Sequence, residues 1–183
     1  MTKKEGLAGV FALLLIISIG WLWLTPAGLS KAPDIIFKII DGRQINLQDL
    51  RGQPVLVTFW ATTCSGCIKE MPHLISLYNE LSGDGLEIIG VAMAYDPPNQ
   101  VLEMTKRRLI PYPIALDIDG NAAKAFGNVM LTPTSFLIAP DGKILQYKIG
   151  EMNMEKLRQQ ITTLLPQQLK VTNKKLKDNN YVL

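Results

Sequence analysis

The sequence predicts an α/β domain built around a mixed sheet, behind one apolar segment of membrane-spanning length. Strand-like and helix-like segments alternate between residues 55 and 94, which indicates a βαβ unit with parallel strands. Two later strand-like segments are joined by a Pro-Asp-Gly-Lys turn at residues 140–143, so the sheet also contains an antiparallel pair. Residues 7–24 carry no charged side chain. The 183 residues suffice for one such domain with appendages.

The apolar segment Leu7–Leu24 is close to the length of about 20 residues with which a helix crosses a bilayer. Trp21 and Trp23 stand at its far end, where interfacial aromatic residues are common. We therefore expect an uncleaved transmembrane anchor. A cleaved signal peptide stays as an alternative because residues 25–27 form a weak cleavage site, and a buried core helix is a third interpretation.

Charge predicts how the chain is arranged about that anchor. Two lysines precede it, so the positive-inside tendency places residues 1–6 in the cytoplasm. Residues 25–33 then form a linker and residues 34–165 a domain outside the membrane. Of the net charge of +3, residues 166–183 carry +3 and residues 1–5 carry +1, so the remainder carries −1. We expect the basic tail to be solvated and flexible, and a nearly neutral domain gives no indication of nucleic acid binding.

The folded part begins with a β-hairpin, since residues 35–40 and 44–47 are strand-like and flank an Asp-Gly turn. Residues 55–60 are a nearly continuous run of β-forming apolar residues, which is typical of a central strand buried on both faces. From Cys67 to Leu81, apolar residues recur every three or four positions and predict a helix that packs on the sheet. The packing residues expected there are Met71, Leu74, Ile75, Tyr78 and Leu81.

The second half of the domain repeats these patterns over shorter segments. The next strand covers residues 86–94. The elements expected after it are a helix at 100–109, a strand at 114–116, a short helix at 121–126, a hairpin of strands at 134–139 and 144–149, and a final helix at 154–165. Asn153 is a favourable N-cap for that last helix.

Cys64 and Cys67 are the only two cysteines, and they stand where the central strand turns into a helix. At this spacing they can form a small disulfide ring or a dithiol. Unpaired N–H groups and the dipole at a helix start favour an anion, which lowers the pKa of the Cys64 thiol below the ordinary value of about 8.5. We expect Cys64 to attack a substrate disulfide and Cys67, less exposed, to resolve the mixed disulfide.

Other uses of the two cysteines fit less well. A structural disulfide normally closes a longer loop, because its stabilising effect grows with loop length. A zinc site needs four ligands, and the only histidine is His73, so we expect no metal. Covalent haem attachment needs a histidine directly after the second cysteine, where this chain has Ile68. Two inert cysteines are the remaining alternative.

The run Phe59–Cys67, with Pro72 eight residues after the first cysteine and Thr132-Pro133 before a strand, resembles the thioredoxin superfamily. The anchor, the first hairpin, the run at 69–72 and the insert around residues 95–118 are similar to its TlpA/ResA branch. That branch consists of membrane-tethered thiol–disulfide oxidoreductases outside the cytoplasmic membrane of bacteria. The resemblance covers residues 33–165 and implies a thioredoxin-like fold on the periplasmic side of the inner membrane.

The resemblance also implies roles for single residues. Cys64 and Cys67 form the redox-active disulfide, and no other cofactor is implied. Pro133 is expected to be a cis-proline beside that disulfide, which leaves the backbone of Thr132 free to pair with a substrate strand. Trp60, which ends the buried strand, is expected to pack near the turn and is a weaker candidate for a substrate contact. Asp96 is the nearest match to an acid that assists the resolving thiol; otherwise it is a turn residue.

Three positions depart from common patterns of the superfamily. Thr58 stands where cytoplasmic thioredoxins carry a buried acid, Thr63 where a tryptophan is frequent, and Gly66 where a proline is frequent. Thr63 reduces the exposed apolar surface beside the disulfide. Glu70 is a candidate for contact with a partner protein, whereas His73 lies on the polar stripe of the helix and is expected to be solvated.

We expect a thiol–disulfide oxidoreductase that reduces disulfides of exported proteins. By resemblance, the substrate is an apocytochrome c or another periplasmic disulfide, and the electron donor is an integral-membrane thiol protein. A peroxiredoxin-like peroxidase is a poorer match, because Val57 and Ala61 stand where its motif before Cys64 needs Pro and Thr or Ser. A Sco-like copper-binding module needs Cys-x-x-x-Cys and a distant histidine, and the spacing here differs.

Overall fold

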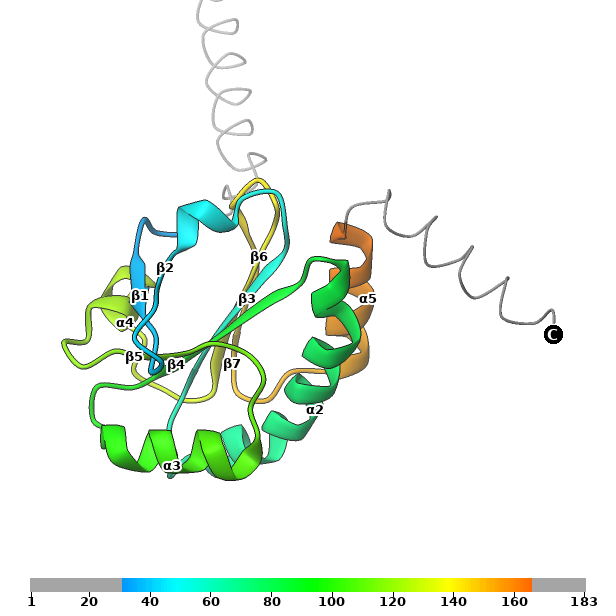
Figure 1. The fold of residues 1–183 in the computed structure, drawn as a ribbon. Coiled ribbons are helices and arrows are strands. Elements are labelled where there is room, and N and C mark those ends of the chain that lie inside the picture. Colours follow the sequence, from blue (N-terminus) through cyan, green and yellow to red (C-terminus); the bar gives the residue numbers. More distant parts are fainter. Residues whose placement is uncertain (1–30, 166–183) are drawn as a thin grey trace, which may run out of the picture. The chain divides into compact units, whose positions relative to one another are not determined.

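The computed structural model describes residues 31–165 (Figure 1). The predicted cytoplasmic residues 1–6, the anchor at 7–24, most of the linker and the tail at 166–183 lie outside the described residues and stay predictions. Within the described range, no helix is both long and apolar enough to cross a membrane.

A five-stranded mixed sheet forms the centre of the domain, with strand order β5-β4-β3-β6-β7. Its members are β3 (Val55–Trp60), β4 (Glu87–Ala92), β5 (Ile114–Leu116), β6 (Thr134–Ile138) and β7 (Ile144–Ile149). β4 runs parallel to β3 and β5, whereas β6 is antiparallel to β3 and β7. Every residue of β3 is buried, because this central strand is covered on both faces.

Two layers cover the sheet. One contains α2 (Ser65–Leu81), α3 (Pro98–Arg108) and α5 (Met154–Leu164), whose buried side chains share an apolar cluster with Leu56 of β3. The other contains the hairpin of β1 (Ile36–Lys38) and β2 (Gln44–Asn46), the 3-10 helix η1 (Leu47–Leu50) and α4 (Asn121–Ala125), which pack with Val57. Figure 1 shows α2 and α5 together on one side and the hairpin with α4 on the other. A second 3-10 helix, η2 (Ser82–Asp84), follows α2.

The parallel strands end at one edge of the sheet, and the loops that follow them meet there. The loop after β3 leads to Cys64, and the loop after β4 contains Asp96. A hydrogen bond of 3.0 Å from Met93 N to Trp60 O continues the pairing of β3 and β4 into this region. The candidate site therefore lies at the carboxyl ends of neighbouring strands, where open α/β sheets commonly place their sites.

The hairpins and the central strand lie where the sequence predicted them, and helix starts differ most. α3 begins at Pro98 rather than Gln100, because proline suits the first helical position, whose N–H would have no partner. α2 begins at Ser65 rather than Cys67, and Cys64 is its N-cap. The mixed sheet is confirmed by the antiparallel pairing of β6 with β7.

Candidate active site

Cys64 and Cys67 are joined in a disulfide at the start of α2, with their Cα atoms 5.3 Å apart. Cys64 is the N-cap, and its Sγ accepts a hydrogen bond of 3.1 Å from Cys67 N. A thiolate at this position would receive the same N–H group together with the favourable helix dipole. Cys64 is half-buried, whereas Cys67 is only 4% exposed. An attacking sulfur can therefore reach Cys64 much more readily than Cys67.

An open groove of about 420 Å³ runs past Cys64. Thr63, Ser65 and Gly66 line it on the side of the cysteine turn. Thr132, Pro133, Gly150 and Glu151 line the rest. The Thr132–Pro133 peptide bond is cis. Gly150 N donates a hydrogen bond of 2.8 Å to Pro133 O, which ties the two loops of this wall together.

Gly66 allows Pro133 and Glu151, on the opposite side of the groove, to lie close to the cysteine turn. A Cβ atom at Gly66 would lie 3.4 Å from Pro133 Cδ and 3.6 Å from Glu151 Oε1. A side chain larger than alanine at position 66 would therefore fill the narrow space between the cysteine turn and Pro133. Glu151 Oε2 also accepts a hydrogen bond of 2.9 Å from Lys69 Nζ, an exposed ion pair across the same gap.

Glu70 is a buried carboxyl on α2, three residues after Cys67. It is 4% exposed, and its Oε1 accepts a hydrogen bond of 2.7 Å from Met152 N. Burial raises the pKa of this carboxyl, an effect that the bond from Met152 only partly offsets. Contact between Glu70 and a partner protein stays a prediction, and it would require this buried carboxyl to become accessible. The spacing from Cys67 places both on one face of the helix, and that signal could have identified Glu70 as part of the site.

A small cavity of about 10 Å³ lies behind the disulfide, between Cys67 and Glu70. Trp60 lines this cavity and is absent from the groove, which gives it a packing position, and its role as a substrate contact stays a prediction. Its Nε1 has no hydrogen-bond partner among the described residues. Thr58 also lines the cavity, and its Oγ1 accepts a hydrogen bond of 2.9 Å from Ser135 Oγ. The position of the superfamily's buried acid is thus a hydroxyl pair here, and Glu70 supplies a carboxyl from another element.

Asp96 is buried in the loop between β4 and α3. Its Oδ2 accepts a hydrogen bond of 2.6 Å from Thr62 N, and its Oδ1 accepts one of 2.6 Å from Thr62 Oγ1. Both oxygens are therefore engaged by the turn two residues before Cys64. Asp96 is absent from the cavity that Cys67 and Glu70 share. This geometry positions the turn, and a role for Asp96 as an assisting acid remains a prediction.

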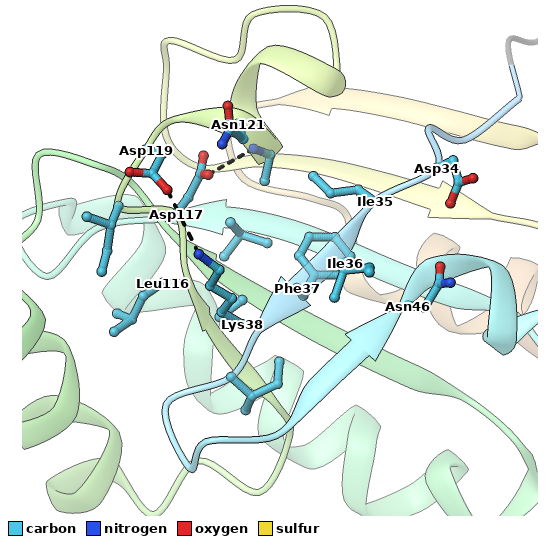
Figure 2. A pocket seen from close by; sticks show the side chains of 15 residues that line it. Asp34, Ile35, Ile36, Phe37, Lys38, Asn46, Leu116, Asp117, Asp119 and Asn121 are labelled. Carbon is cyan, nitrogen blue, oxygen red and sulfur yellow. Dashed lines mark hydrogen bonds and ion pairs between the residues drawn. The ribbon is translucent and has the colours of Figure 1, made fainter.

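A second, larger cavity of about 850 Å³ lies between β1, β5 and the start of α4 (Figure 2). Its floor includes Val91 and Ala115, which belong to the apolar cluster of the hairpin side, whereas Cys67 belongs to the cluster of the α2 side. Asp117 in this cavity accepts hydrogen bonds of 2.8 Å from the N–H groups of Ala122 and Ala123. Neither cysteine of the disulfide is among its lining residues.

Residues 31–165 contain no cluster of three His, Cys, Asp or Glu side chains that could hold a metal ion. His73 lies exposed on α2. The disulfide supports attack on the more exposed sulfur, Cys64, and resolution by the buried one, Cys67.

Comparison with known proteins agrees with this geometry. The family model described as Redoxin matches residues 28–165. The thiol–disulfide oxidoreductase ResA of Bacillus thuringiensis subsp. konkukian is 35% identical over 137 residues, which cover 75% of this chain and 78% of that protein. The crystal structure of StoA from Bacillus subtilis matches with 31% identity and a TM-score of 0.60, covering 73% of this chain and 98% of that one.

The fold has a further structural relative. A thiol:disulfide interchange protein of the thioredoxin family from Chlorobium tepidum is 23% identical with a TM-score of 0.70, covering 78% of this chain and 100% of that chain. At this identity the likeness supports the fold alone. Together with the disulfide at the start of α2, the family match and the ResA relative show that the chain belongs to the Redoxin family of the thioredoxin superfamily and is a ResA-like thiol–disulfide oxidoreductase.

Proposed function

We propose that the protein reduces disulfides of exported proteins from a position on the outer face of the bacterial cytoplasmic membrane. The observation that carries this proposal is the asymmetry of the cysteine pair: Cys64 opens into a groove, and Cys67 is buried behind it beside a carboxyl. An open nucleophile with a shielded resolving thiol suits an enzyme that holds a polypeptide briefly and releases it reduced. The anchor predicted at residues 7–24 would keep this groove near the membrane.

The proposed reaction exchanges one disulfide for another. In the reduced protein, the Cys64 thiolate attacks one sulfur of the substrate disulfide, and the other substrate sulfur leaves as a thiolate and takes up a proton. Cys67 then loses its proton and attacks Cys64, which releases the second substrate sulfur. Two electrons pass to the substrate, which gains two protons, and the Cys64–Cys67 disulfide is formed. An integral-membrane thiol protein is the donor that would reduce it again.

Glu70 is the group that we propose to accept the proton of Cys67. It shares the small cavity with Cys67, and burial raises the pKa of its carboxyl, which makes the carboxylate a better proton acceptor. The hydrogen bond from Met152 N fixes one of its oxygens. This leaves the second oxygen as the acceptor that a proton from Cys67 would reach.

The wall of the groove suits an extended polypeptide. Thr132 lies in it next to Pro133, and we propose that its backbone pairs with a substrate strand beside Cys64. We propose apocytochrome c cysteines as the substrate class, in keeping with the ResA relative and with the branch that the sequence resembles. Such substrates present a Cys-x-x-Cys-His disulfide in an unfolded segment.

Redox titration of the full chain in detergent tests the proposed direction. We expect a reduction potential comparable to that of cytoplasmic thioredoxin, about −270 mV. The reduced protein should then reduce a synthetic peptide that contains an oxidised Cys-x-x-Cys-His motif. A potential near that of a strong oxidant, about −120 mV, would contradict the proposal. So would a reduced protein that leaves the peptide oxidised.

A further inference from the structure

The first hairpin and the five-stranded sheet meet at one point and then separate. β1 belongs to the two-stranded sheet, and β5 is the edge strand of the larger one. An antiparallel bridge pairs Ile39 with Ala115, and Ile40 N donates a hydrogen bond of 2.9 Å to Ile114 O. Within residues 31–165, no further backbone hydrogen bond joins the hairpin to β5. Beyond this bridge the two strands therefore run unpaired.

The cavity of about 850 Å³ lies where the strands have separated (Figure 2). We call it the strand cleft. β1 forms one wall, and residues 116–118 form the other. Asp117 fixes the second wall, because its carboxylate accepts hydrogen bonds from the start of α4. Figure 2 shows Lys38 reaching across the gap, with its Nζ 4.0 Å from Asp119 Oδ2.

The wall formed by β1 presents unpaired backbone groups to the cleft. Ile35 O and Ile39 N make hydrogen bonds of 3.0 and 2.9 Å to the other strand of the hairpin. In a strand, successive residues direct their N–H and C=O groups to opposite edges, so those of Ile36 and Lys38 point toward β5. Within residues 31–165, these groups have no backbone partner on that side.

The opposite wall has a matching unpaired edge. Asp117 N donates a hydrogen bond of 3.1 Å to Ala92 O of β4. Its neighbours Leu116 and Ile118 therefore direct their N–H and C=O groups away from β4 and toward the cleft. Two facing strand edges with free donors and acceptors form the arrangement to which an extended polypeptide can add as a further strand.

The side chains of the cleft define which polypeptide suits it. Val91 and Ala115 give it an apolar floor. Ile36 and Ile118 are 54% and 64% exposed, and a strand between the walls would cover part of both. Three aspartates and one lysine line the cleft, which gives it a net charge of −2. Apolar residues that alternate with lysine or arginine complement both features.

We propose that the strand cleft binds an extended polypeptide segment of alternating apolar and basic residues, as a β-strand between β1 and β5. Main-chain hydrogen bonds to both walls hold the segment, and its basic side chains pair with the aspartates. The site is separate from the redox groove, because none of the residues that line the groove lines the cleft. The proposal therefore adds a second polypeptide site to the proposed function and does not depend on it.

Peptide binding to the oxidised full chain in detergent tests the proposal. The probe is a blocked, cysteine-free peptide, Val-Lys-Val-Lys-Val, with a fluorescent label. One comparison peptide has N-methyl groups on its valine amides, which removes backbone donors and keeps the side chains. Another has glutamate in place of lysine. We expect the probe to bind at least about tenfold more tightly than either, a factor that one or two hydrogen bonds or ion pairs supply. It should also slow amide hydrogen exchange in residues 36–38 and 116–118.

Two sets of variants locate the bound peptide. Ile36→Pro removes the N–H that faces the cleft and keeps the bonds within the hairpin, because that N–H points away from β2. Ile36→Val is the matched control, since it keeps the N–H and a β-branched apolar side chain. We expect the proline variant to bind the probe about tenfold more weakly and the valine variant to bind it within about twofold of the wild type. Asp34→Asn combined with Asp119→Asn should remove most of the preference for lysine over glutamate.

The outcomes decide the proposal separately from the proposed function. It is overturned if the probe does not bind at 1 mM, about the weakest affinity of interest, or if the N-methylated peptide binds as tightly. Equal binding by the proline and valine variants overturns it too; if the proline variant does not fold, the N-methylated peptide decides. Exchange protection of both walls without peptide that grows with protein concentration would assign the cleft to a second copy instead. Failure of the reduced protein to reduce oxidised glutathione would overturn the proposed function and leave this proposal standing.

Discussion

Replacement of Glu70 with Gln is expected to stabilise the oxidised protein at neutral pH and to leave its stability in acid unchanged. Burial raises the pKa of the Glu70 carboxyl above the value of 4.5 that it has in an unfolded chain. Between these two pKa values the folded state holds a proton that the unfolded state has lost, so stability falls as the pH rises through this window. Below the window Glu70 is neutral in both the folded and the unfolded state. The wild type and the Glu70→Gln variant should therefore have the same stability there.

The magnitude follows from the raised pKa and from one hydrogen bond. Each unit by which folding raises the pKa costs the wild type about 1.4 kcal/mol above the window. A glutamine keeps an oxygen to accept the bond of 2.7 Å from Met152 N. Glu70→Ala removes this acceptor and leaves a buried N–H group unpaired, which costs about 1–3 kcal/mol at acid pH. At that pH, the alanine variant should therefore be less stable than both other proteins.

Urea unfolding of the oxidised proteins in detergent at about pH 4 and about pH 7.5 measures both effects. The cysteines are in the disulfide under these conditions, so they do not contribute to the difference. Other titrating groups, such as Glu87, cancel between wild type and variant. The reasoning is refuted if Glu70→Gln has the same effect at both pH values, or if the wild type is the more stable protein at the higher pH.

The remaining predictions concern catalysis and the packing around the site. Glu70→Gln should slow the decay of the mixed disulfide about 100-fold in rapid-quench experiments, because the proton acceptor is lost. Glu80→Gln, on the exposed face of α2, should leave this rate unchanged. Equal decay rates in the two variants would exclude Glu70 as the acceptor. Asp96→Ala leaves Thr62 N unpaired and should cost about 1–3 kcal/mol in urea unfolding, against less than about 0.5 for the exposed Asp119→Ala. Gly90→Ala should lower the free energy of unfolding by about 1–3 kcal/mol in the same assay, because the new Cβ would lie 2.7 Å from Ile114 Cδ1. A Cβ at Gly83 would meet no atom within 4 Å, so Gly83→Ala should leave the stability unchanged or raise it slightly. Similar effects of the two glycine substitutions would contradict the packing described here.

Features determined by local sequence were predictable. The continuous apolar run of β3 and the Asp-Gly turn of the first hairpin specify structure within a few residues, and both lie where expected. The cysteine pair also follows from local pattern, because it stands at a strand-to-helix junction. Its disulfide is the redox group that the resemblance implied.

The environment of Glu70 was not predictable from the helix pattern. The sequence suggested Glu70 only as a candidate for contact with a partner protein, yet its carboxyl accepts a hydrogen bond from Met152 N, 82 positions along the chain. The loop before α5, which carries Met152, contributes to that burial, as do Trp60 and Tyr112 from other parts of the chain. Leu77 illustrates the same limit: it is fully buried in α2, although the predicted stripe placed Ile75 and Tyr78 inward, and these are half-buried.

The identity of the attacking sulfur is the central claim of this account, and a trapping experiment measures it most directly. Reduced full-chain Cys67→Ala and Cys64→Ala variants are each mixed with a disulfide peptide, and the adducts are mapped by mass spectrometry. The account predicts a stable mixed disulfide on Cys64 in the Cys67→Ala variant and little adduct in the Cys64→Ala variant, because Cys67 is only 4% exposed. Equal trapping on the two cysteines, or trapping on Cys67 alone, would contradict it.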